Sequence, residues 1–210
     1  TGGNMQAGLT DAVAVSLAQL AEINELALEL LAGRASGDSA GLPPLLRESA
    51  GLWRTLSALQ RQRMAGCPFL LIEIGFDELA PRSHGTLAGV REAREEVRWF
   101  VEESLPRLSY LTLTYAWHLV RTRRFAARIV LGLREDCIEW LAALSLRQLG
   151  ECLECSPRFL RPRWAGNPEV WRHLLTAAAS AEPADFELAR LRGMQLLAAA
   201  YWPAVRSPER

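Results

Sequence analysis

The feature that most constrains this chain is the helical spacing of its apolar residues. Between positions 10 and 32 they recur every three or four residues, at Val13, Leu17, Leu20, Ile23, Leu26 and Leu30. Thr10 or Asp11 is a suitable N-cap for this helix, and Gly33 a natural stop. One face of the segment must pack against other elements, which favours a mainly α-helical protein.

The same spacing predicts further helices along the chain. They are expected over residues 45–64, after a turn at 81–85, and over 108–130, 135–144, 145–155, 169–179 and 183–201. One segment differs: residues 69–76 are β-branched and flanked by Pro and Gly, so they are the best strand candidate. Three prolines make residues 157–164 extended or irregular. At most short β segments are therefore expected.

Composition excludes several classes of protein. Half of the 210 residues are apolar and the formal net charge is zero, as in globular proteins. The apolar stretches are too short for a membrane span, so no membrane insertion is expected. The first residues lack the basic segment of a secretory signal. We therefore expect a cytoplasmic protein.

The four cysteines leave two interpretations open. Cys152 and Cys155 have CxxC spacing, but they fall in a predicted helix and no second CxxC follows. A closed zinc site needs four ligands, and only Cys137 and His173 are near enough in sequence to complete one. Packed, reduced thiols are the favoured interpretation, so neither metal nor cofactor is predicted.

At residues 108–154 the sequence LSYLTLTYAWHLVRTRRFAARIVLGLREDCIEWLAALSLRQLGECLE resembles the flagellar transcriptional activator FlhD. The shared features are the LSYL opening, a junction formed by Arg128 and the run Leu131–Leu133, and an acidic turn. LAAL at 141–144 and the following helix complete the match. Residues 184–199 could correspond to the final helix of that family.

A weaker match to the same pattern lies in the first half. Ile23 and Asn24 open a helix, TLSALQRQRMA at 55–65 takes the place of LAAL and its following helix, and IEIGFDE at 72–78 takes the extended end. We therefore expect two tandem FlhD-like helical repeats, over residues 1–84 and 85–210. They could pack as one unit, because the family forms homodimers and a tandem copy could be a pseudo-dimer.

The resemblance implies a transcriptional regulator, or a subunit of one, that acts mainly through protein contacts with an FlhC-like partner. The alternative is a scaffold or accessory protein of a secretion or flagellar apparatus that does not bind DNA. Zero net charge favours this alternative, because DNA-binding proteins are usually basic. A homo-oligomer is compatible with both.

Duplex DNA, if bound, would be contacted non-specifically through the second half. Residues 105–210 hold 15 Arg against 10 acids, whereas residues 1–104 hold 9 Arg against 14 acids. The candidate phosphate contacts on the predicted helices are Arg121, Arg123, Arg124, Arg128 and Arg134. A solvated helix end, with Arg favourable near the C-terminal dipole, is the alternative interpretation.

A second candidate group interleaves arginines with aromatic residues. It comprises Arg158, Arg161 and Arg163 beside Phe159 and Trp164, and such arginines either bind nucleic acid or cover core aromatics. Among the seven tryptophans, Trp171 and Trp202 are candidate partner contacts. The common catalytic motifs are absent from the sequence, and the three His are far apart, so no enzyme activity and no catalytic residue is predicted.

Overall fold

The computed structural model describes residues 2–37, 41–76 and 99–201, and they are mainly helical with one short two-stranded sheet. The predicted fold class is therefore confirmed. The predicted boundary between the halves, at residues 84 and 85, lies outside the described residues.

The first half consists of one long helix, three short ones and a strand. These are α1 (Gly2–Ser36), α2 (Pro44–Glu48), α3 (Ala50–Thr55), α4 (Ala58–Ala65) and β1 (Ile72–Ile74). The prediction of one helix over residues 45–64 was wrong. The backbone leaves the helical region at Leu56 (ψ 108°), and Ser57 then begins a new helix by accepting a hydrogen bond from the N–H of Gln60.

The described residues of the second half repeat this order of elements and add two further helices. It comprises a 3₁₀ turn (Glu102–Ser104), α6 (Leu105–Thr122), α7 (Arg124–Leu131), α8 (Glu135–Ala143), α9 (Leu146–Cys155), a second 3₁₀ turn (Ser156–Phe159), β2 (Leu160–Pro162), α10 (Pro168–Ala179) and α11 (Pro183–Tyr201). The predicted helix over 108–130 is divided at Arg123 (φ −147°, ψ 66°). Gly132 ends α7 in the left-handed conformation (φ 63°), which favours glycine.

Two other predictions needed correction. Within the segment 69–76, expected to be a strand, only Ile72–Ile74 forms a regular β-strand, paired with the three residues of β2. The helix expected after residue 85 falls largely outside the described residues. Its expected members Phe100 and Val101 are not helical, since Val101 has extended backbone (ψ 135°).

The strand pair relates the two halves by a local twofold axis. β1 and β2 are antiparallel, with Glu73 opposite Arg161, and these two residues are 88 positions apart. The same offset links the flanking hydrogen bonds. The N–H of Gly75 donates to the carbonyl of Phe159 (3.0 Å), and the N–H of Arg163 donates to the carbonyl of Leu71 (2.8 Å). Exchanging each residue for its counterpart 88 positions away therefore turns one bond into the other: Gly75 becomes Arg163, and Phe159 becomes Leu71.

The helices that precede the two strands are related by the same offset of 88 residues. Ser57 caps α4 and Ser145 caps α9, each in a capping box with the Gln three residues later. Buried positions of α1 and α6 also correspond: Leu20 with Leu108, and Leu31 with Leu119. The two halves thus share an order of elements, a cap and a buried face.

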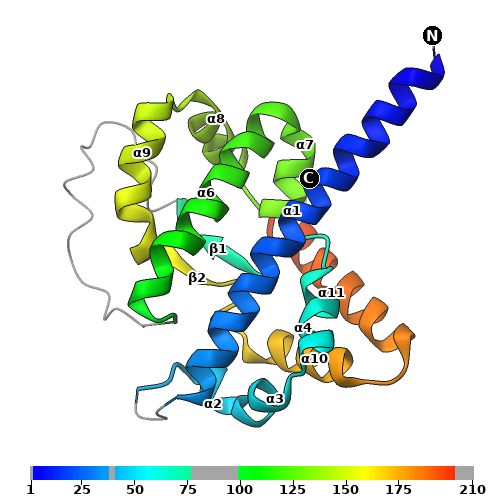
Figure 1. Cartoon of the computed structure of the whole chain (residues 1–210), viewed down its shortest axis with the longest axis vertical. Coiled ribbons are helices and arrows are strands. Elements are labelled where there is room, and N and C mark those ends of the chain that lie inside the picture. The colour runs from blue at the N-terminus through cyan, green and yellow to red at the C-terminus, as the bar shows by residue number, and fades with distance from the viewer. Residues whose placement is uncertain (1, 38–40, 77–98, 202–210) are drawn as a thin grey trace, which may run out of the picture.

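The core lies between the halves. Buried residues of both halves form one hydrophobic cluster, and α1 and α6 pack against each other. The two helices cross the centre of the molecule in Figure 1, with α8 and α9 on one side and α4, α10 and α11 on the other. The N-terminal part of α1 extends beyond the other elements. A cluster shared in this way means that each half covers apolar surface of the other.

Helices α10 and α11 cover the first half. α10 packs on α2, α3 and α4, and its Trp171 lies 5.3 Å from Trp53 between ring centroids. Arg63 of α4 stacks over Phe186 of α11 and donates to the carbonyl of Ser180 (2.9 Å). Gly193 lets α11 approach closely, because a Cβ there would lie 2.5 Å from the ring of Phe69.

Candidate interface on the second half

The arginine surface, as we name Arg121, Arg123, Arg124, Arg128 and Arg134, is built by the turns that join α6, α7 and α8. Arg123 separates α6 from α7, and Gly132 turns the chain so that α8 begins beside α7. This places one face of α7 opposite the first turns of α8. Acidic residues are favourable in the first turn of a helix, and α8 begins with Glu135 and Asp136.

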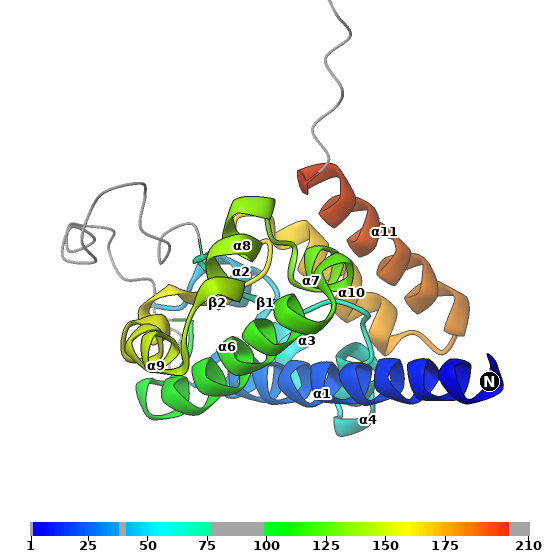
Figure 2. The ribbon, with the colours of Figure 1, turned by 90° about the horizontal axis from the view of Figure 1, so that it is seen from above.

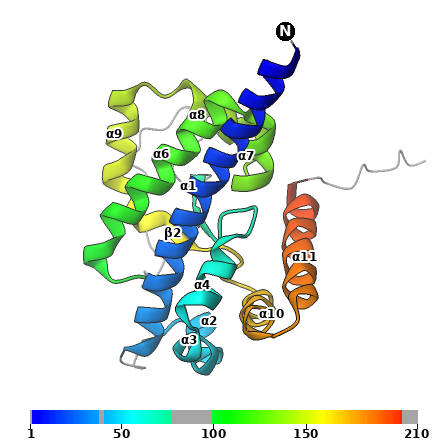
Figure 3. The same cartoon turned by 45° about the vertical axis from the view of Figure 1, so that its right-hand side comes forward.

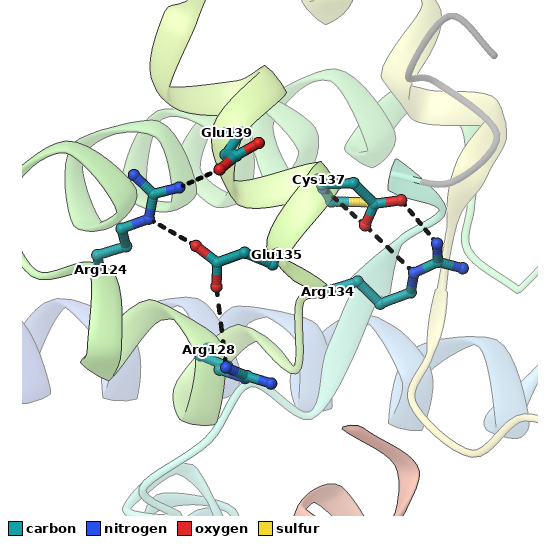
Figure 4. A network of polar contacts seen from close by, with 7 residues as sticks. Arg124, Arg128, Arg134, Glu135, Cys137 and Glu139 are labelled. Atoms are coloured by element: carbon teal, nitrogen blue, oxygen red, sulfur yellow. Dashed lines mark hydrogen bonds and ion pairs between the residues drawn. The ribbon is translucent and has the colours of Figure 1, made fainter. Parts of the chain in front are cut away.

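Two of the five arginines form ion pairs with glutamates of α8. Arg124 binds Glu135 through Nε (2.8 Å) and Glu139 through Nη2 (3.1 Å). Arg128 lies 3.8 Å from the other oxygen of Glu135. Figure 4 shows Glu135 between the two guanidinium groups. Each side chain remains about half exposed, so these pairs add little stability, but they lower the local positive charge.

A third arginine is paired within its own turn. Arg134 donates to both carboxylate oxygens of Asp136 (2.6 and 3.2 Å), and the N–H of Cys137 donates to the same carboxylate (3.0 Å) (Figure 4). Slight burial raises the pKa of Asp136, but the hydrogen bonds from Arg134 and from the backbone outweigh it and lower the pKa. Asp136 is thus held as an anion next to Arg134.

Arg121 and Arg123 are placed differently. The Arg121 guanidinium lies 4.6 Å from the centre of the Trp117 ring, and both side chains donate to the carbonyl of Leu144. Arg123 is half-buried at the junction of α6 and α7. Five arginines with three paired acids leave a net charge of about +2 on this surface. Its capacity to bind phosphate is therefore smaller than the arginines alone predict.

The second predicted group is not brought together on one surface. Arg158 is exposed, whereas Arg161 pairs with Glu73 (2.7 Å) across the two strands. Arg163 is 2% exposed and donates to the carbonyls of Leu70 (2.6 Å), Leu131 (2.8 Å) and Ile72 (3.4 Å). Assigning Arg163 to a nucleic-acid surface was therefore wrong: a guanidinium enclosed by carbonyl oxygens cannot reach a phosphate.

Trp171 is likewise a core residue. It is fully buried, packs on Trp53 and donates from Nε1 to the carbonyl of Arg163 (2.6 Å). The prediction of Trp171 as a partner contact was wrong for this reason. Trp202, the other candidate, lies outside the described residues.

The cysteines that the structure describes are packed thiols. Cys67, Cys137 and Cys152 are buried, while the side chain of Cys155 is outside the described part. Burial raises the pKa of Cys67 to about 12, only partly opposed by Arg190. No group of three His, Cys, Asp or Glu that could hold a metal ion occurs among the described residues.

A small cavity lies at the edge of the sheet, next to the arginine surface. Its volume is about 110 Å³, and its lining includes Glu73, Gly75, Phe76, Arg134 and Cys137. Ligand pockets in proteins are usually several times larger. A cavity of this size suits a single small side chain or a few water molecules.

Sequence reasoning missed a set of exposed apolar side chains. Leu59 at the start of α4 is 76% exposed, and Leu146 at the start of α9 is 73% exposed. Both leucines lie in the first turn of a helix that begins with a capping box, but one position apart, because Leu59 is two residues after its cap and Leu146 is one. Phe125 of α7 is 72% exposed beside the arginine surface. Large apolar side chains at such positions are typical of protein contacts.

Comparisons of the chain with protein families, with curated proteins and with solved structures gave no match. Within residues 2–37, 41–76 and 99–201, none of the helices is both long enough and apolar enough to cross a membrane.

Proposed function

We propose that this chain is a subunit of a transcriptional regulator that acts mainly through contacts with another protein. More particularly, we propose an FlhD-like subunit in which two repeats in one chain take the place of a homodimer. DNA contact, where it occurs, is non-specific and limited to the arginine surface.

The observation that carries this proposal is the twofold relation of the two halves across Glu73 and Arg161. The resemblance to FlhD covers residues 108–154 well and the first half weakly. An offset of 88 residues links both capping boxes, both strands and the two flanking hydrogen bonds. The first half therefore supplies the partner that a single repeat would need.

Two further observations favour protein contacts over DNA contacts. Acids of α8 pair with Arg124, Arg128 and Arg134, which reduces the attraction of this surface for phosphate. In addition, Leu59, Leu146 and Phe125 are exposed, and apolar side chains of this size gain free energy when a partner covers them.

The alternative function is that of a scaffold or accessory protein of a secretion or flagellar apparatus. The zero net charge and the paired arginines favour it. Both functions use the same exposed leucines, so surface chemistry does not separate them. What separates them is whether removal of the protein alters transcription or only the working of an assembled apparatus.

The test is to delete the gene, return it as wild type or variant, and measure all transcripts. We expect a defined set of transcripts to change on deletion and to recover with the wild type. Leu59→Ser/Leu146→Ser should fail to restore them while remaining folded. Arg147→Ala, at an exposed site on α9, is the matched control and should restore them. Unchanged transcripts together with a secretion or motility defect would contradict the proposal and favour the alternative.

DNA contact is tested by binding to mixed duplex DNA at about 50 and about 200 mM salt. We expect weak binding with a shallow salt dependence, equivalent to about two or three phosphates. Arg121→Ala/Arg124→Ala/Arg128→Ala should abolish it. Glu135→Gln/Glu139→Gln should strengthen it, because these variants release Arg124 and Arg128 from their ion pairs. Equal binding by both sets of variants would exclude the arginine surface as the contact.

A further inference from the structure

Helix α11 has two apolar faces, and only one of them is used within the chain. The inner face packs on the body of the molecule through Phe186, Ala189, Gly193 and Leu197, all of which are buried. The close approach of Gly193 to Phe69 holds this face in place. A helix at the edge of a monomer normally has polar residues on its other side.

The outer face of α11 is instead a stripe of mostly apolar residues. We define the outer stripe as Ala184, Leu188, Leu191, Gln195 and Ala198, all exposed. Leu188 is 50% and Leu191 55% exposed. The intervals of four, three, four and three residues are those of the d and a positions of a coiled coil. In Figures 2 and 3, α11 stands at the edge of the molecule, with one side away from the other elements.

We propose that the outer stripe is a dimerisation surface that binds α11 of a second copy of this chain, parallel and in register. A two-stranded coiled coil buries a and d positions, and its b, c and f positions face outward. In α11 the b, c and f positions are those that pack on the molecule's own body. The twofold axis of such a dimer would run along the outer stripe, with the two bodies on opposite sides.

Charge complementarity selects the parallel orientation. Glu187 is a g position and Arg192 is the e position five residues later, the spacing at which parallel coiled coils form ion pairs between chains. Glu187 already accepts a hydrogen bond from Arg190 of its own helix (2.8 Å), and its second oxygen can accept another. An antiparallel pair centred on Leu191 would instead bring the two Arg192 side chains together.

Gln195 selects the same orientation and also the register. It is exposed at an a position among apolar neighbours of the outer stripe. In a parallel, in-register pair, a positions face each other, so the two Gln195 side chains can exchange hydrogen bonds. In the antiparallel pair each would face Leu188 and lose its partners. One polar a position is a common means of fixing register.

The outer stripe spans only two heptads, so the dimer should be weak. Its apolar contacts come mainly from Leu188, Leu191 and Met194, and stable interfaces usually bury far more surface than two leucines supply. We expect a dissociation constant of about 10 to 100 μM, which allows monomers and dimers to exchange with concentration.

The first experiment is sedimentation velocity of the intact chain from about 1 to about 200 μM. The wild type should pass from monomer to dimer over this range. Leu191→Asp should raise the dissociation constant at least about tenfold, because it places two carboxylates against each other at a d position. Tyr110→Asp, at a residue of α6 that is 56% exposed and lies outside the outer stripe, is the matched control and should leave it unchanged. A wild type that stays monomeric at every concentration overturns the proposal, as does a dimer that tolerates Leu191→Asp.

The second experiment tests orientation by oxidative cross-linking. Ala184→Cys and Ala198→Cys should each form disulfide-linked dimers on their own, since like positions meet in a parallel pair. Glu187→Arg should weaken the dimer, and Glu187→Arg/Arg192→Glu should restore it. The circular dichroism of each variant checks that it is folded. Cross-links that form only when Ala184→Cys and Ala198→Cys are mixed would overturn the parallel arrangement.

Discussion

The two halves of this chain have the same order of helices and strand, but they differ in the contacts that these elements make. In the first half, Asn24 of α1 holds the segment that leads from α4 to β1. Its side-chain amide donates to the carbonyls of Ala65 and Phe69 and accepts from the N–H of Leu71. The equivalent residue of the second half, Thr112, bonds only to Leu108 in its own helix (2.7 Å). At this position the first half therefore has buried polar contacts to the segment before its strand that Thr112 does not repeat in the second half.

In the second half, the helices between the first helix and the strand are longer than those in the first half. α7 and α8 contain eight and nine residues, whereas α2 and α3 contain five and six. The longer helices present the arginine surface and Phe125, while α2 and α3 lie beneath α10. In the first half these short helices are thus covered by α10, whereas α7 and α8 leave Phe125 and most of the arginine surface accessible.

The largest predicted effect on stability concerns Trp53 and Trp171, which pack against each other where α10 covers the first half. Trp171→Ala should lower the free energy of unfolding by about 3 to 5 kcal/mol, because it leaves a cavity against Trp53 and frees the carbonyl of Arg163. Trp140→Ala, on partly exposed α8 in the second half, is the matched control and should cost clearly less. Urea denaturation measures both, and equal losses would contradict the structural role given to the packing of α10 on the first half.

Replacement of Asn24 should have the next largest effect on the free energy of unfolding. Asn24→Ala leaves one buried N–H and two carbonyls without partners, so it should lower the free energy of unfolding by about 2 to 4 kcal/mol. Thr112→Val, at the equivalent position, removes one hydroxyl that bonds within its helix and should cost about 1 kcal/mol or less. Comparable losses at the two positions would remove the distinction drawn between the halves.

Alkaline pH should weaken the first half through Cys67. Its pKa is raised by burial to about 12 in the folded chain, against 9.0 for an ordinary thiol. The unfolded chain thus loses this proton first. The free energy of unfolding is therefore unaffected by Cys67 ionisation below pH 9. It declines as the pH rises from 9 towards 12, and at pH 10.5 it should be lower by about 2 kcal/mol. The difference in unfolding free energy between wild type and Cys67→Ala should shrink accordingly; a difference that is constant over this range would argue against a buried thiol.

The smallest effect is expected at the twofold axis itself. The Glu73–Arg161 pair is 28% and 34% exposed, so solvent screens it and its coupling energy should be only about 0.5 to 1 kcal/mol. Glu73→Arg and Arg161→Glu should each destabilise the chain slightly. The double exchange should recover most of the loss, and a double-mutant cycle with no coupling would show that the pair does not contribute.

Much of this fold was predictable from local patterns. Apolar spacing located α1, α6 and α10, because one buried face imposes a period that the sequence shows directly. The split of residues 45–64 was less evident, since it depends on Leu56 turning to extended backbone before the Ser57 cap. Arg163 and Trp171 were misassigned because their environment is set by segments distant in sequence. Burial beneath α10 and beside β1 cannot be read from neighbours along the chain.

The arginine surface illustrates the same limit. Its arginines are evident from residues 121–134, and the acids that neutralise them follow immediately at 135–139. The sequence alone does not show that Gly132 turns α8 back beside α7. Acids in the first turn of the predicted helix were the available signal.

The central claim is that two related halves form a single structural unit across the strand pair. Hydrogen exchange of the Gly75 and Arg163 amides tests it most directly, because these N–H groups make the equivalent bonds between the halves. We expect both amides to exchange only through global unfolding, so that the free energy of exchange equals the free energy of unfolding measured with denaturant. If either amide exchanges through a lower-energy opening that leaves the other protected, the halves are not one unit and the claim is wrong.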